Sequence, residues 1–431
     1  MRIGLINEFF TPFAPGGAEW SMFELGKALV GSGHQVAVIT PNYGAEGESV
    51  ESGMHVLRFP FPKKLKTGRK MPGFLWHANL LFYFYSAWQI FIIAKKERLE
   101  ILHCQNKYSL PGSFLAARLL GIPVVCSIRD TSNICRIAVC LHHHEAAPKD
   151  CGTWKLLKEC SEEYYDRYYE KKSLWLHAKD KIWQVYHWWD VHLRRSCLNR
   201  VDLIVGVSQG ILNVHEKSRI FLRSKAKRRA IYNFVNQDLN HQAPESNSLR
   251  KKYGVIKSKI VLYVGGFSIG KGTSNFAQAA SLVSKKNKNV SFILIGSGKL
   301  QESNGDVQII SDVSHEDVLQ FYKLADVVVV PSICQESLSR VILEAMAAGR
   351  PVVGTQVGGT SEAISDGENG YVVERRDTEA LANAIEKILS DGLLAKKMGQ
   401  KSLEIVKQKF SKEAVISQFE NLYSSLIKKG G

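Results

Sequence analysis

The chain has 431 residues, of which 45% are hydrophobic and 23% are charged. This length and composition exclude an intrinsically disordered chain and a disulfide-stapled miniprotein, and they predict two domains that each bury a core. Lysine and arginine outnumber aspartate and glutamate by 57 to 41, a formal net charge of +16, which predicts an acidic partner. The eight cysteines form no compact framework, so we expect reduced thiols.

The first half alternates short apolar segments with helical patterns, which predicts a parallel sheet wound with helices. Its start, MRIGLINEFF, lacks the basic residues and continuous apolar core of a signal peptide, which favours a cytoplasmic location. The loop PGGAE at 15–19 lets backbone amides approach an anion at a helix start, unless it is a plain tight turn. Strands are predicted at 2–6, 35–40, 56–59, 101–104, 124–128, 202–207 and 230–235.

Positive charge is concentrated in two clusters, Lys63–Lys70 and Arg223–Arg229. A solvated face explains each cluster, and an anionic lipid surface is the alternative partner. No helix-turn-helix or base-stacking motif accompanies them, so we expect no nucleic acid.

An uncharged segment of 21 residues, Phe74–Ala94, follows the first cluster, and hydropathy alone makes it a candidate membrane span. His77, Asn79 and Gln89 argue against a span, and the strand predicted at 101–104 favours a crossover helix of the sheet. Its tryptophans and tyrosines keep a helix lying in a bilayer interface as the alternative.

A long aromatic excursion, residues 131–200, separates two strands and is expected to shape the side that receives the acceptor. It contains Cys135, Cys140, Cys151 and Cys160, with three histidines at 142–144. A zinc site is one interpretation, but the spacings fit no standard finger or ribbon, so a reduced structural cluster is preferred.

The second half repeats the strand and helix alternation after a polar hinge predicted at 238–256. Two doubly wound Rossmann-like domains facing across a cleft follow: residues 1–240 and 241–415, with a C-terminal helix at 416–431 that packs back on the first domain. Strands are predicted at 260–264, 291–295, 327–331, 351–354 and 371–373, with helices at 316–325 and 377–390.

Two carboxylates flank the start of a helix in this half. Glu336 lies on the loop after a run of valines, and Glu344 lies inside a helix whose apolar residues recur at helical spacing. Such a pair suits a nucleotide-sugar, because carboxylates accept hydrogen bonds from ribose and sugar hydroxyls while amides of the helix's first turn hold the diphosphate. Two solvated surface acids are the alternative.

The ordered motifs around this pair resemble the family 4 retaining glycosyltransferases, which have the GT-B fold. That family shows Glu, seven residues and Glu, then Ala-Met-Ala, Gly-x-Pro-Val-Val and Gly-Gly. Here these motifs are Glu336, Glu344, Ala345–Ala347, Gly349–Val353 and Gly358-Gly359. The resemblance is specific in the second domain and looser over residues 50–250.

The resemblance implies roles for individual residues. Glu336 orients the sugar, Glu344 the ribose, and Lys271 neutralises the leaving phosphate. Further donor-site residues are expected to be Gly16 and Gly17 in the glycine loop, Val313 near the base, the segment Ser337, Leu338 and Ser339, and His103 at the end of a strand; for His103, a core histidine is the alternative.

This chain departs from the family pattern at three positions. Gly266 stands where the family has an arginine that grips the diphosphate, Arg129 where it often has a histidine, and Gln105 where it has a second histidine. Arg129 cannot act as a base, but its guanidinium suits phosphate and is predicted to supply the missing charge.

The sequence therefore predicts a retaining hexosyltransferase that moves a sugar from a nucleotide-diphosphate sugar to a hydroxyl of a glycan or lipid-linked acceptor, without a metal ion or other cofactor. We expect a role in surface polysaccharide or lipopolysaccharide assembly, in the cytoplasm or on the inner face of the plasma membrane. A nucleotide-sugar 2-epimerase on the same fold and a non-catalytic sugar-nucleotide-binding subunit are the alternatives.

Overall fold

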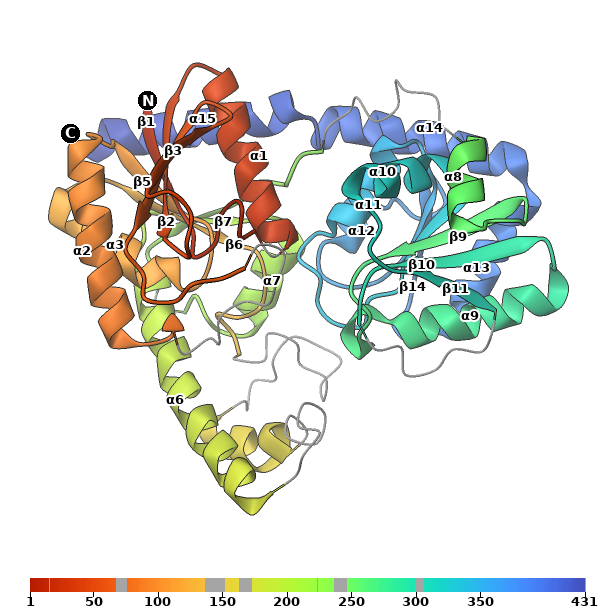
Figure 1. Ribbon diagram of the computed structural model, residues 1–431, viewed down its shortest axis with the longest axis horizontal. Helices are drawn as coiled ribbons and strands as arrows, with labels where there is room; N and C mark the ends of the chain where they lie inside the picture. Colours follow the sequence, from red (N-terminus) through yellow and green to blue (C-terminus); the bar gives the residue numbers. More distant parts are fainter. Residues whose placement is uncertain are drawn as a thin grey trace. The chain divides into compact units, whose positions relative to one another are not determined.

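A computed structural model describes residues 1–14, 16–66, 76–135, 152–162, 173–222, 224–235, 246–298 and 306–430. The chain divides into two compact units, the first Met1–Ile231 with Ile416–Gly431 and the second Tyr232–Val415. Each unit is built on one sheet with helices on its faces (Figure 1). The sequence suggested a boundary after residue 240, which lies outside the described residues.

The first unit contains an eight-stranded sheet in the order β3-β4-β2-β1-β5-β6-β7-β8. All neighbours pair in parallel except β3, which is antiparallel to β4. The inner strands are buried on both faces, as continuous apolar runs predict. Their bounds are β1 Arg2–Ile6, β2 Gln35–Pro41, β3 Glu48–Glu51, β4 Met54–Phe59, β5 Ile101–Cys104, β6 Val124–Ile128, β7 Leu203–Gly206 and β8 Lys227–Ala230.

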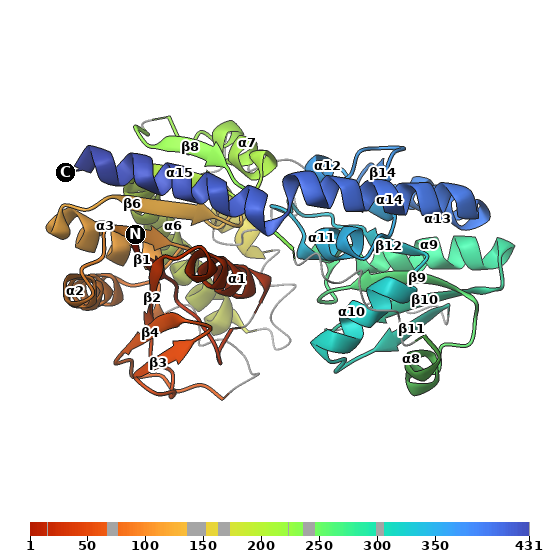
Figure 2. The same cartoon turned by 90° about the horizontal axis from the view of Figure 1, so that it is seen from above.

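Helices of the first unit connect these strands and cover the sheet. The crossover helices are α1 Gly17–Gly31, α2 Leu80–Lys96, α3 Ser109–Leu120 and α7 Gln209–Lys217, while α4 Thr153–Lys155, the π-helix Leu156–Cys160 and α6 Leu174–Leu198 belong to the excursion. The last helix, α15 Lys412–Gly430, lies along this sheet from Ile416 onward (Figure 2). Glu420 on α15 contacts His34 at 2.9 Å.

The second unit contains a six-stranded parallel sheet in the order β11-β10-β9-β12-β13-β14. Its strands are β9 Lys259–Val264, β10 Val290–Ile295, β11 Val307–Ile310, β12 Val327–Val330, β13 Val352–Thr355 and β14 Gly370–Val373. Its helices are α8 Ser246–Tyr253, α9 Thr273–Lys286, α10 His315–Leu324, α11 Arg340–Ala347, α12 Thr360–Ala363, α13 Thr378–Ser390 and α14 Gly392–Lys409, and a 3-10 turn spans Ile269–Lys271.

The structure corrects four expectations. The strand predicted at 230–235 is wrong, because β8 ends at Ala230 and is a basic edge strand with alternating exposure. The short strands β3 and β11 were not expected. The predicted hinge at 238–256 contains α8, and its residues up to 245 lie outside the described part. The helix predicted from residue 74 begins at Leu80, where the Asn79 side chain accepts a hydrogen bond from the Phe82 amide at 2.7 Å.

Among the described residues, no helix has the length and apolar character that crossing a membrane requires. The interpretation of residues 74–94 as a span is therefore not supported for the described part of that segment.

Both sheets have a switch point, where the chain leaves two adjacent parallel strands in opposite directions. In the first sheet it lies between β1 and β5, and in the second between β9 and β12. Ligands of open α/β sheets bind beyond the carboxyl ends of the strands at such points. The residues that follow these four strands are therefore the candidates for function.

Candidate functional site

The loops after β9 and β12 are joined by close backbone contacts. The amides of Ile333 and Cys334 donate hydrogen bonds to the Gly270 carbonyl at 2.9 and 3.0 Å. Gly272 has a φ of +72°, and a Cβ there would lie 1.8 Å from the Pro331 oxygen. Only glycine fits this position, so the Gly-Lys-Gly turn that carries Lys271 is held against the loop that carries Glu336.

Lys271 and Glu336 form an ion pair at this switch point. Ser332 also donates a hydrogen bond to the Glu336 carboxylate at 3.2 Å. Desolvation opposes the charged form of Lys271, but attraction and hydrogen bonding to Glu336 outweigh it and raise the Lys271 pKa. The Lys271 side chain remains 44% exposed against 12% for Glu336, so the ammonium stands at the open side of the pair.

The backbone of Glu336 is held by the Gly-Gly motif before α12. Gly359 donates its amide to the Glu336 carbonyl at 3.0 Å. A Cβ on Gly358 would lie 1.5 Å from that same oxygen, and the φ of Gly358 is +49°. These glycines therefore position the Glu336 loop by close approach of one backbone to another.

Glu344 lies inside α11, as predicted, and is buried. Its carboxylate accepts a hydrogen bond from the Tyr322 hydroxyl at 3.1 Å and from the Arg340 guanidinium at 3.1 and 3.3 Å. Burial, followed by the charge of Glu344, raises the pKa of Tyr322 well above its usual range, so Tyr322 remains a donor. The carboxylate is thus held in one orientation from both sides.

The other predicted donor residues of this unit lie at the same edge of the sheet. Ser337, Leu338 and Ser339 form the segment that enters α11, and Ser339 is its N-cap residue. Val313 lies in the turn between β11 and α10, next to Asp312, whose φ is +55°. The ligand-binding roles predicted for these residues stay predictions.

Gly16 and Gly17 open α1 after β1, at the switch point of the first sheet. The Glu19 carboxylate accepts a backbone hydrogen bond from Gly16, and desolvation raises the pKa of Glu19. The Gly16 amide, which was predicted to bind an anionic ligand, is therefore already bound to a carboxylate of the chain itself.

His103 is fully buried in β5. Its Nε2 contacts the Ser127 hydroxyl at 2.8 Å, and its Nδ1 contacts the Tyr423 hydroxyl of α15. Burial, with a smaller contribution from Arg129, lowers the pKa of His103 to about 3. Both ring nitrogens thus have partners inside the first unit, and a ligand would have to displace one of them.

Two of the three departures from the family pattern contact each other. Arg129 donates a hydrogen bond from its guanidinium to the Gln105 side-chain oxygen at 2.6 Å. Gln105 is buried, and its Nε2 has no hydrogen-bond partner among the described residues. Gly266, the third departure, belongs to the second unit.

Two residues at the switch point of the first sheet were not predicted from the sequence: Glu8, which follows β1, and Lys107, which follows β5. Glu8 is buried and accepts a hydrogen bond from the Tyr108 amide at 2.6 Å, while its second oxygen has no partner in the described part of the chain. Burial raises the pKa of Glu8 to about 7, against a smaller lowering influence of Lys107. The available signal was a polar pair, Asn7-Glu8, directly after an apolar strand.

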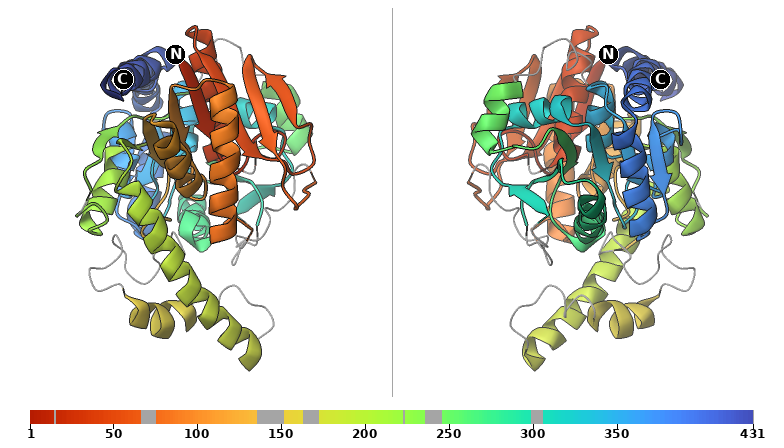
Figure 3. Two further views of the ribbon diagram at one scale, coloured as in Figure 1. Left: turned by 90° about the vertical axis from the view of Figure 1, so that its left-hand side faces the viewer. Right: turned by 90° about the vertical axis from the view of Figure 1, so that its right-hand side faces the viewer.

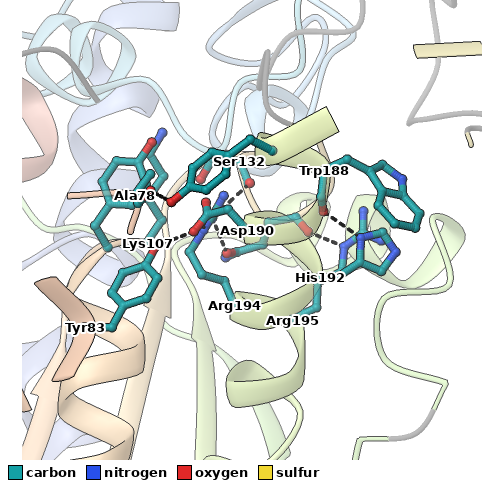
Figure 4. Close-up of polar contacts among 12 residues, drawn as sticks. Ala78, Tyr83, Lys107, Ser132, Trp188, Asp190, His192, Arg194 and Arg195 are labelled. Atoms are coloured by element: carbon teal, nitrogen blue, oxygen red, sulfur yellow. Dashed lines mark hydrogen bonds and ion pairs between the residues drawn. The ribbon is translucent and has the colours of Figure 1, made fainter. Parts of the chain in front are cut away.

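The excursion helix α6 carries a buried ion pair, Asp190–Arg194, and both members of the pair also contact neighbouring elements of the first unit (Figure 4). Asp190 accepts hydrogen bonds from Arg194 at 2.9 Å and from the Tyr83 hydroxyl of α2. Arg194 also donates to the Ser132 carbonyl at 3.1 Å and lies 5.3 Å from the ring centroid of Tyr108. Because the Tyr108 amide binds Glu8, this network connects α6 to the switch point.

The zinc interpretation falls largely outside the described residues, which omit Cys140, Cys151 and the histidines at 142–144. Cys135 and Cys160 lie within the described residues, and both are half-buried. Within the described ranges, no three His, Cys, Asp or Glu side chains are grouped as a metal site would require.

Two family models match the chain. The model "Glycosyltransferase Family 4" covers residues 15–239, which is 225 of the 431 residues, and "Glycosyl transferases group 1" covers residues 258–391. The matched ranges contain the glycine loop after β1 and the Lys271, Glu336 and Glu344 cluster respectively.

Curated relatives include N-acetyl-alpha-D-glucosaminyl L-malate synthase of Bacillus anthracis, 28% identical over 55% of this chain and 63% of that protein. The capsular polysaccharide biosynthesis glycosyltransferase CapM of Staphylococcus aureus is 30% identical over 43% of this chain and 51% of that protein. The matches thus span between half and two thirds of these relatives' length.

Among solved structures, HepE of Anabaena in complex with UDP superimposes with a TM-score of 0.68 at 19% identity, over 99% of this chain and 100% of that chain. This likeness shows the GT-B fold. Together with the family match over more than half of the residues, it means that the chain belongs to glycosyltransferase family 4.

Proposed function

We propose that this glycosyltransferase retains the anomeric configuration of a sugar that it moves from a nucleotide-diphosphate sugar to a hydroxyl of a glycan or lipid-linked acceptor. The observation that carries this proposal is the grouping, at one switch point, of a half-exposed lysine ion-paired with Glu336 and a buried, doubly held Glu344. A diphosphate needs a cation, and sugar and ribose hydroxyls need fixed acceptors.

The ion pair explains how donor binding orders this site. A diphosphate beside Lys271 competes with Glu336 for the ammonium and draws it toward the ligand. The Glu336 carboxylate is then free to accept hydrogen bonds from sugar hydroxyls, while Ser332 and the Gly359 amide keep its loop in place. HepE, whose structure contains UDP, supports a nucleoside diphosphate as the donor's leaving group.

Retention follows if the donor phosphate leaves on the face from which the acceptor attacks and takes the acceptor proton. The bond between the sugar C1 and the donor's phosphate oxygen breaks, and a bond between C1 and the acceptor oxygen forms. The acceptor's proton goes to the departing diphosphate, so no protein base is required. The chain then contributes position and charge stabilisation through Lys271 and the amides before α11. We propose that this proceeds without a metal ion, which transfer in the presence of EDTA tests directly.

For the acceptor, we propose a growing surface polysaccharide or glycolipid handled at the inner face of the plasma membrane. CapM acts in capsular polysaccharide biosynthesis by its name, which supports this class. In the first unit, the second oxygen of Glu8 and the Nε2 of Gln105 are buried without a described partner, and a hydroxyl brought to this switch point would satisfy them once the surrounding side chains move.

The first test is a thermal-shift comparison of UDP, GDP, ADP and their common sugars. Wild type is compared with Glu344→Gln and with Glu404→Gln, a control whose side chain is 60% exposed on α14. A rise of several degrees with one nucleotide, kept in the control and lost in Glu344→Gln, supports the donor site. No rise with any nucleotide in wild type contradicts the donor proposal.

The second test follows product stereochemistry by NMR with the identified donor. Product with the donor's anomeric configuration supports retention, and an inverted product contradicts it. A non-catalytic binding subunit is the second candidate, favoured by the absence of an arginine at Gly266. Nucleotide binding without transfer to any acceptor class would support it, whereas an epimerised sugar released without acceptor would indicate the epimerase.

A further inference from the structure

The α2 helix has apolar side chains on both of its faces. Its inner face buries Phe82, Tyr83 and Ile90 in the core of the first unit. On its outer face Leu81 is 84% exposed, Phe84 63% and Trp88 58%. A surface helix of a globular protein normally presents charged or polar residues there. The outer face of α2 is therefore built for contact with something apolar.

These outer residues form one continuous stripe along the helix. Leu81, Phe84, Trp88 and Ile92 recur at spacings of three or four, which places them on one side of an α-helix. The Trp88 and Phe91 rings stack at 6.0 Å, and the Lys95 ammonium lies 6.0 Å from the Phe91 centroid. We call the side chains Leu81, Phe84, Trp88, Phe91, Ile92 and Lys95 the α2 stripe.

No described element covers the stripe. The left view of Figure 3 shows α2 as the orange helix that stands in front of the first sheet, while α6 runs past its end and away from it. Two hydrogen bonds join α6 to the N-terminal end of α2, where Tyr186 donates to the Ala78 carbonyl just before the helix starts and Tyr83 donates to Asp190.

Positive charge borders the stripe at its C-terminal end and at its flank. Lys95 and Lys96 occupy the last turn. The segment 60–66, with three further lysines, is attached to α2 because Tyr85 donates a hydrogen bond to the Pro60 carbonyl at 2.7 Å. The nearby carboxylates are already engaged, since Glu97 and Glu48 both contact His55.

We propose that the α2 stripe docks the protein on an anionic lipid bilayer, with its apolar side chains at the boundary of headgroups and acyl chains. Lys95 and the lysines at 63, 64 and 66 would contact lipid phosphates. Because the opposite face of the helix is packed in the core of the first unit, only the stripe can enter the bilayer, and the helix lies in the plane of the interface. A second copy fits less well, because a symmetric dimer through the stripe brings like-charged lysines together.

The proposal deepens the proposed function, because it names the surface that meets a membrane-borne acceptor. It is tested by flotation of the full chain with vesicles of phosphatidylcholine alone or with phosphatidylglycerol. The test variant is Leu81→Ser, Phe84→Ser and Trp88→Ser combined. Its matched control combines Val50→Ser, Ile256→Ser and Leu393→Ser, which are 74%, 93% and 83% exposed on other parts of the chain.

We expect wild type and control to float with anionic vesicles, and the stripe variant to lose about 100-fold in partition, since three apolar side chains no longer leave water. Replacing Lys63, Lys64, Lys66 and Lys95 by glutamine should remove the dependence on anionic lipid. Equal flotation of stripe variant and control, or a lipid-free dimer that dissociates only in the stripe variant, overturns the proposal.

Nucleotide-induced thermal shifts separate this proposal from the proposed function and report folding of the variants. A stripe variant that keeps the nucleotide shift and loses flotation supports docking by a folded protein. Flotation that depends on the stripe in a protein without any nucleotide shift leaves the docking proposal standing and removes the donor proposal. If the stripe variant loses a nucleotide shift that wild type shows, Trp88→Ser alone is tested in its place. Unchanged flotation of Trp88→Ser then counts against docking.

Discussion

The two switch points carry charge in opposite ways. In the second unit each carboxylate has a cation beside it, Lys271 for Glu336 and Arg340 for Glu344, and both cations reach solvent. In the first unit the Glu8 carboxyl is buried, with a backbone amide for one oxygen and no described partner for the other. Under the proposed function, the first arrangement would exchange an internal partner for a charged ligand, whereas burial of Glu8 favours a neutral carboxyl, which suits uncharged hydroxyls.

The loops at the two switch points are also held differently. In the second unit, glycines bring backbones together at Gly272 and Gly358. In the first unit, side chains reach in from distant elements, above all the Asp190–Arg194 pair of α6. Variants that affect only the side-chain contacts of the first unit, or only the charged groups of the second, therefore test whether the two switch points differ in this way.

The largest expected effect is on stability and comes from Asp190→Ala. It leaves the buried guanidinium of Arg194 without its carboxylate, and Tyr83 without its acceptor. The free energy of unfolding should fall by about 3–5 kcal/mol, measured by urea denaturation.

The exposed pair Lys286–Glu386, 2.9 Å apart in the second unit, is the control for this prediction. Lys286→Ala should cost less than about 1 kcal/mol. The double variant Asp190→Leu with Arg194→Met should recover most of the stability, because no charge then stays buried. A cost near 1 kcal/mol for Asp190→Ala would show that α6 does not hold the first unit.

Next in size is the effect of Lys271→Met on transfer. Loss of the cation beside the leaving diphosphate should lower kcat by about 10²–10³-fold. The thermal stability without ligand should change little, because the lysine is half exposed. Stopped-time assays with saturating donor give the rate, and an unchanged kcat would remove Lys271 from the chemistry.

A smaller effect is expected from Glu8→Gln, and it depends on pH. Since burial raises the folded-state pKa of Glu8 from 4.5 to about 7, the folded chain binds more protons than the unfolded chain between these values. Wild-type stability should therefore fall as pH rises through this window, by about 1–3 kcal/mol, and the loss should persist above it. Glutamine does not titrate, so the stability difference should shift in favour of Glu8→Gln between pH 5 and pH 8. A difference that is constant with pH would mean that Glu8 is solvated.

Much of the fold was predictable because the residues of each central strand are sufficient to identify it as a buried strand. Continuous apolar runs such as Val124–Ile128 and Val327–Val330 can only be buried on both faces. The strands β3 and β8 read ESVE and KRRA and were missed or misplaced. Nothing in their own residues favours a strand, and they form because β4 and β7 offer free edges.

The candidate site residues also fall into two groups, those that a local motif predicts and those that only distant contacts define. Lys271, Glu336 and Glu344 could be named because an ordered motif surrounds them within one unit. Glu8 depends on an amide 100 residues away, and Asp190 on a tyrosine 107 residues away. Burial of a charged side chain by distant elements leaves no local trace in a sequence, which is why these residues emerged only from the structure.

The smallest expected effect concerns the cation that Gly266 does not supply. A Cβ on Gly266 would have its nearest atom, the Ser297 oxygen, at 3.9 Å, so an arginine can be introduced there without a clash at its base. If Arg129 replaces the missing charge, Arg129→Met should lower the transfer rate by about 10-fold, and adding Gly266→Arg should restore it. Gly266→Arg alone should change the rate little, because the charge is then already present. If the double variant stays as slow as Arg129→Met, Arg129 does not replace the charge missing at Gly266. Its effect would then come from its hydrogen bond to Gln105 in the first unit.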